Sequence, residues 1–111
     1  MKVREIVAAL DLQVFCGEDG LDKEISGGYT SDLLSDVMGN IEDGAVWITL
    51  QTHKNVVAIA SLRDISAVIF VKGLKPEEAT VVQSKMEGIP LLGSELEAFE
   101  LSGRLYALLN K

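Results

Sequence analysis

The chain has very little of what disulfide and metal chemistry needs. Its 111 residues include one cysteine, Cys16, and one histidine, His53. A single thiol cannot form an internal disulfide, and one Cys with one His cannot build a conventional metal site. We therefore expect no metal or other cofactor, and we expect Cys16 to pack as a small apolar side chain.

Positive charge is also scarce. The chain carries 10 Lys and Arg against 17 Asp and Glu, for a net charge of −7 and a pI near 4.6. Contacts to phosphates need cations in excess, so nucleic acid and anionic membranes are disfavoured as partners. No apolar run has the length of a membrane span, and residues 1–5 lack the start of a signal peptide. A cytoplasmic protein is the resulting expectation.

The sequence motifs of common nucleotide-binding and hydrolytic sites are missing as well. There is no Gly-x-x-x-x-Gly-Lys-Ser/Thr loop, no Gly-x-Gly-x-x-Gly fingerprint and no Gly-x-Ser-x-Gly elbow. The first two hold phosphates on backbone N–H groups, and the third presents a nucleophilic serine. Their absence argues against the corresponding enzyme classes.

What is present is the pattern of a small α/β domain. With 48% hydrophobic residues and 2 prolines, the chain fits one globular domain over residues 1–111. Apolar spacing predicts a helix at 3–10, short extended pieces at 12–15 and 24–27, and a helix through 33–38. Three further strands, at 45–50, 67–71 and 89–92, alternate with helices at 55–62, at 76–88 and from 94 onward. This alternation predicts a three-layer domain with a mainly parallel sheet.

Two helix starts carry specific sequence signals. Pro76 suits the first position of its helix, where its missing N–H costs nothing. Ser94 and Glu97 have the spacing of a capping box, in which each side chain bonds to the backbone N–H of the other residue. We therefore expect helices to begin at these two places.

Residues 22–32 form the first candidate binding segment. Two adjacent glycines free the backbone for a positive φ or for close approach of a ligand, and the hydroxyl and carboxylate residues after them suit the N-cap of a helix. Polar ligands and anions are often held at such junctions. The candidate ligand-binding residues here are Ser26, Gly27, Gly28, Thr30, Ser31 and Asp32. The alternative is a tight turn that joins a strand to a helix.

The second candidate segment follows the predicted strand at 45–50. Ligands of open α/β sheets bind outside the carboxyl ends of strands. The residues there that offer polar groups are Gln51, Thr52, His53 and Asn55. We expect both segments to form the walls of one groove. The alternative is that Thr52 caps a helix while His53 is solvated.

The segment Asp-Lys-Glu-Ile-Ser-Gly-Gly at 22–28 resembles the motif of the DRTGG domain family, and the resemblance continues through 29–37, 47–53 and 99–106. Lys23 stands for the family's arginine and Ser26 for its threonine. The resemblance implies a fold similar to the N-terminal domain of HPr kinase/phosphorylase. It also implies an accessory or regulatory role, as in domains attached to phosphotransacetylases and to cystathionine-β-synthase-type modules, and no established catalytic residues.

These observations lead to a functional expectation. A mean hydropathy of +0.25 is high for so short a chain and favours burial against a second copy, so we expect a homodimer. The leading hypothesis is a non-catalytic regulatory or sensor module for a small polar, possibly phosphorylated, ligand or a protein partner. One alternative is a pure interaction module that uses the helix at 55–62. Another is a small enzyme in which His53 is the general base and Asp32 or Asp36 orients it.

Overall fold

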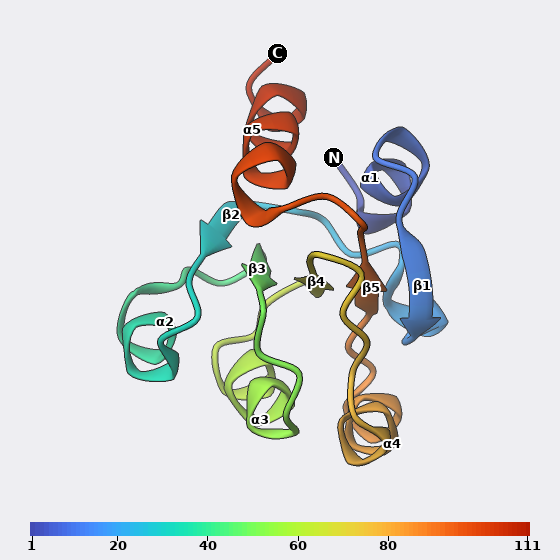
Figure 1. Ribbon diagram of the computed structural model, residues 1–111, viewed down its shortest axis with the longest axis vertical. Coiled ribbons are helices and arrows are strands. Elements are labelled where there is room, and N and C mark those ends of the chain that lie inside the picture. The colour runs from blue at the N-terminus through green and yellow to red at the C-terminus, as the bar shows by residue number, and fades with distance from the viewer.

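The computed structural model describes all of residues 1–111, and Figure 1 shows three layers. Helices α1 (Val3–Ala9) and α5 (Ala98–Leu109) cover one face of a central sheet. Helices α2 (Leu34–Asn40), α3 (Asn55–Leu62) and α4 (Glu78–Glu87) cover the other face. The expected small three-layer α/β domain is confirmed.

The sheet has five strands in the order β1-β5-β4-β3-β2. Strands β2 to β5 are mutually parallel, and only β1 is antiparallel to its neighbour β5. The strands are β1 (Gln13–Cys16), β2 (Gly27–Thr30), β3 (Ala45–Thr49), β4 (Ala67–Phe70) and β5 (Leu91–Gly93). The two edges of the sheet are therefore β1 and β2.

Two apolar clusters fill the space between the layers. Trp47 and Phe70 lie in the cluster beneath α2, α3 and α4, and Ile48 lies with Leu101 and Leu105 in the cluster beneath α1 and α5. Every residue of β3, β4 and β5 is buried. These strands read as continuous apolar runs in the sequence because both faces of the sheet are covered.

The prediction for residues 24–32 is wrong in its local structure. An extended piece was predicted at 24–27, and Thr30, Ser31 and Asp32 were predicted to supply the N-cap of the helix at 33–38, with a tight turn as the alternative. Instead β2 begins at Gly27, and α2 begins only at Leu34, with no side-chain cap. Pairing with β3, from Gly27 opposite Ala45 to Thr30 opposite Ile48, outweighs the low strand propensity of glycine.

Both signalled helix starts are also displaced. Helix α5 begins at Ala98 without a side-chain cap, and the Ser94 hydroxyl accepts the N–H of Leu96 at 3.1 Å instead. Helix α4 begins at Glu78, two residues after Pro76. Its entry is set by a tertiary contact, because the Glu77 N–H donates to the carbonyl of Thr52 at 3.2 Å.

Candidate functional site

A groove of about 330 Å³ runs between the edge strand β2 and helix α5. We call it the β2–α5 groove. Ser26, Gly27, Gly28 and Thr30 line it from the strand, and Ile48 forms part of its floor. The helix contributes Ser102, Leu105, Tyr106, Leu109 and Asn110. None of these residues is charged, although the chain carries a net charge of −7.

Gly28 keeps this groove open. A Cβ at this position would lie 3.3 Å from the Leu105 Cδ2, which is closer than most such contacts allow. A Cβ at the neighbouring Gly27 would meet nothing within 4 Å. A larger side chain at Gly28 would therefore project into the groove, whereas one at Gly27 would not press on the helix.

Most polar side chains of the groove already have a partner within the chain. The hydroxyls of Thr30 and Ser102 lie 2.7 Å apart, the Ser26 hydroxyl donates to the Asp43 carbonyl at 2.6 Å, and Asn110 bonds to its own helix. A phosphate would find no cation among the lining residues, and charge-assisted bonds are the strong ones for phosphates. The groove therefore suits an uncharged polar group.

Asp32 and Gln51, one residue from each predicted segment, do meet at the carboxyl end of β3. Asp32 Oδ1 accepts the Thr49 hydroxyl at 2.9 Å and the Leu50 N–H at 2.7 Å. The Gln51 side-chain amide donates to the Asp32 carbonyl at 3.0 Å. Nearby, the Trp47 indole N–H donates to the Ser31 carbonyl at 2.8 Å. These bonds tie the two loops together.

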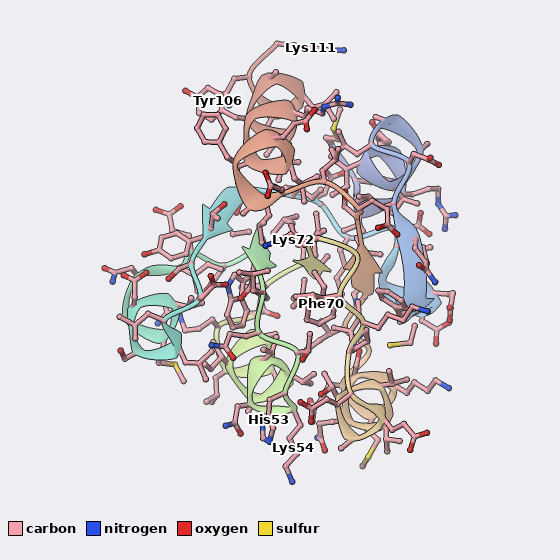
Figure 2. The ribbon with its side chains drawn as sticks, viewed as in Figure 1. His53, Lys54, Phe70, Lys72, Tyr106 and Lys111 are labelled. Carbon is pink, nitrogen blue, oxygen red and sulfur yellow. The ribbon has the colours of Figure 1, made fainter.

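The remaining residues of the second segment lie elsewhere. Figure 2 shows His53 and Lys54 below α3, directed away from the sheet. His53 Nδ1 accepts the Asn55 N–H at 3.2 Å, and no hydrogen bond links it to a carboxylate. The Thr52 carbonyl accepts the Thr80 hydroxyl at 2.7 Å, and Asn55 lines a separate hollow between α3 and α4. The two predicted segments therefore do not line one common groove. The pairing of His53 with Asp32 or Asp36, on which the alternative of a small enzyme depended, is not formed.

A polar cluster around Asp36 has no signal in the sequence. The Tyr29 hydroxyl donates to both Asp36 carboxylate oxygens, at 2.9 and 3.0 Å, and the Asn40 amide donates at 3.1 Å. Hydrogen bonds from the hydroxyls of Ser31 and Tyr29, and from Asn40, hold the pKa of Asp36 below its ordinary value of 3.8. The same bond to Asp36, together with desolvation, raises the pKa of Tyr29.

We expect Tyr29→Phe to raise the pKa of Asp36 toward its ordinary value, since one donor to the carboxylate is lost. A depressed folded-state pKa gives stability that is present above 3.8 and is lost as the pH falls through the folded pKa. The variant should therefore be less stable than wild type at neutral pH, and this difference should shrink in that acidic range. NMR titration of Asp36 checks the shift. An unchanged pKa would contradict the role of the Tyr29 hydroxyl.

The helix side of the groove was missed by the sequence predictions. Ser102, Tyr106 and Leu109 recur at helical spacing on one side of α5. That spacing could have identified a shared face, but not that the face lies beside β2, more than 70 residues earlier in the chain. None of the α-helices combines the length and apolar character that a membrane span requires. No three His, Cys, Asp or Glu residues gather in a way that could hold a metal ion.

No protein-family model matches the chain, and no curated protein matches it. Among solved structures, the chain is similar to the CBS and DRTGG domains of the regulatory region of Clostridium perfringens pyrophosphatase, complexed with the activator diadenosine tetraphosphate. The TM-score is 0.69 at 15% identity, over 95% of this chain and 45% of that chain. The chain therefore spans less than half of that structure. At this identity the similarity shows the fold alone.

Proposed function

We propose that this chain is a single-domain, non-catalytic regulatory module that binds a small polar ligand in the β2–α5 groove. The observation that carries the proposal is an uncharged groove of about 330 Å³ that a glycine keeps open beside an edge strand. The neighbour of like fold is a regulatory region, and its structure contains a small-molecule activator. A phosphorylated ligand would place its neutral part in the groove and its phosphate in solvent.

The alternative is a module that recognises a protein and no small molecule. Phe99 and Tyr106 favour it, because their side chains are 93% and 70% exposed on α5. Contiguous exposed apolar surface marks interaction sites, and these two aromatic residues lie two turns apart on the same helix. This alternative predicts that no small molecule stabilises the protein.

Screening by thermal shift with nucleosides, nucleotides and phosphorylated metabolites tests the ligand proposal. A ligand at 100 times its Kd stabilises the folded state by about 2.7 kcal/mol, which raises the Tm of a domain of this size by roughly 10 °C. Gly28→Val should abolish this shift, because its methyl groups would fill the groove while a β-branched residue suits a strand.

His53→Ala is the matched control for Gly28→Val. Its side chain lies on the far side of α3 from the sheet, so the ligand-induced shift should be unchanged. Loss of the shift in His53→Ala together with its retention in Gly28→Val would place the ligand outside the groove. No shift with any compound in the wild-type protein would remove the ligand and favour the interaction module.

A further inference from the structure

The two edges of the sheet are protected very differently. Strand β1 has an irregular register between Val14 and Cys16, and such bulges prevent another strand from pairing with an edge. Strand β2 has a regular register with β3 and contains no charged residue and no proline. No strand lies beyond β2 (Figure 1). The β2 edge is thus open to strand addition.

The outward-facing backbone groups of β2 follow from its pairing with β3. The Ser26 N–H donates to the Gly44 carbonyl at 2.9 Å. Because backbone groups alternate in direction along a strand, Gly28 also faces β3, whereas the N–H and C=O groups of Gly27 and Tyr29 face away from it. Gly27 and Tyr29 therefore each offer one hydrogen-bond donor and one acceptor at this edge.

The surroundings of this edge favour self-association. Phe99 and Tyr106 lie two helical turns apart on α5, on either side of Ser102, whose hydroxyl touches Thr30 of β2. Both aromatic side chains are largely exposed, and the β2–α5 groove, which Tyr106 helps to line, contains no charged residue. Two copies of a chain with a net charge of −7 repel each other least at uncharged surface. The groove on the α5 side of this edge is uncharged, whereas Glu42 lines the hollow on its other side.

We propose that a second copy of the chain binds at this edge, with β2 paired antiparallel to β2 of the partner across a twofold axis. Such pairing is strand addition with a symmetric partner. With the axis at Gly28, Gly27 would exchange two hydrogen bonds with the partner's Tyr29, and Tyr29 would do the same with the partner's Gly27. Gly28 would face the partner's Gly28 in a non-hydrogen-bonded pair, where Cα atoms approach to about 4.5 Å.

The glycine pair fits this arrangement at both positions. Gly28 has no side chain to crowd its symmetry mate at the closest approach. A Cβ at Gly27 would meet nothing within 4 Å, so there is room for the partner's Tyr29 opposite it. The proposed dimer does not depend on the proposed ligand, although β2 contributes both to the groove and to the open edge. The second strand would lie in the plane of the sheet, whereas the ligand groove lies on the face beneath α5.

Sedimentation equilibrium over a wide concentration range tests the proposal with two changes at Gly27. Gly27→Pro removes an outward N–H from each copy without removing a β2–β3 bond, and we expect the dimer Kd to rise at least about tenfold. Gly27→Lys places a charge on the edge, as natural edge strands do, and should yield a folded monomer. Met86→Lys is the control: it adds the same charge at a 76% exposed site on α4 and should leave the Kd unchanged.

Hydrogen exchange gives a second readout. The amides of Gly27 and Tyr29 should be protected in the dimer and should exchange rapidly after dilution. A wild-type chain that stays monomeric at high concentration would overturn the proposal, as would a dimer weakened by Met86→Lys and not by either Gly27 variant. If an added extended peptide protected these amides in a chain that stays monomeric, the β2 edge would bind another partner and not a second copy. Ligand-induced stabilisation of the wild-type chain at concentrations below the dimer Kd would support the groove whichever result the dimer gives.

Discussion

Replacing Trp47 with alanine is expected to lower the free energy of unfolding by about 3–5 kcal/mol. Trp47 is the largest fully buried side chain of the molecule and lies in the middle of β3. Alanine would leave a cavity in the cluster beneath α2, α3 and α4. It would also remove the donor for the Ser31 carbonyl. Urea denaturation followed by circular dichroism measures the loss.

Trp47→Phe separates the two contributions. Phenylalanine keeps much of the buried ring but lacks the indole N–H, so the change should cost about 1–3 kcal/mol, mainly from the unpaired carbonyl and a smaller cavity. An alanine variant within about 1 kcal/mol of wild type would contradict the packing of β3 described here. Equal losses in the two variants would show that the bond to Ser31, and not the volume of the ring, dominates.

Gly17→Ala is expected to destabilise the protein by about 3 kcal/mol. Gly17 has a φ of +83°, a left-handed conformation that costs a non-glycine residue roughly 1–2 kcal/mol. A Cβ there would also press on the backbone that connects α4 to β5, with Pro90 Cα 2.5 Å away and the Ile89 carbonyl closer still. Backbone cannot move aside as a flexible side chain can, so the strain and the clash add.

Gly39→Ala is the matched control, because the same substitution is expected to change the stability of the protein in the opposite direction. Gly39 lies in α2 with no positive φ, and a Cβ there would meet nothing within 4 Å. Alanine should therefore stabilise the protein by about 0.5–1 kcal/mol, because the unfolded chain loses freedom. Chemical denaturation of both variants gives the comparison. A neutral Gly17→Ala would mean that the corner after β1 does not approach residues 89–90 so closely.

The candidate site shows where prediction from sequence stops. Asp32 and Gln51 were expected to share a wall, and they do lie together, because both follow the carboxyl ends of adjacent parallel strands. His53 was grouped with them by proximity in sequence. After Gln51 the chain turns toward α3, which begins at Asn55, and His53 in this turn is directed away from the sheet. Gln51 and His53 are only two residues apart, yet Gln51 lies at the carboxyl end of β3 and His53 lies on the far side of α3 from the sheet.

The sequence by itself determined the class of fold and most of its elements. The buried strands β3, β4 and β5 and the helix α3 are recognisable because apolar runs and helical spacing are local properties of the chain. Only the tertiary structure decided that Gly27 and Gly28 belong to an edge strand, because their conformation comes from pairing with β3. It also decided that α5 lies beside that strand and forms the other wall of the groove. The helical spacing of Ser102, Tyr106 and Leu109 marks a shared face of α5, but no local pattern indicates that this face lies beside residues 26–30.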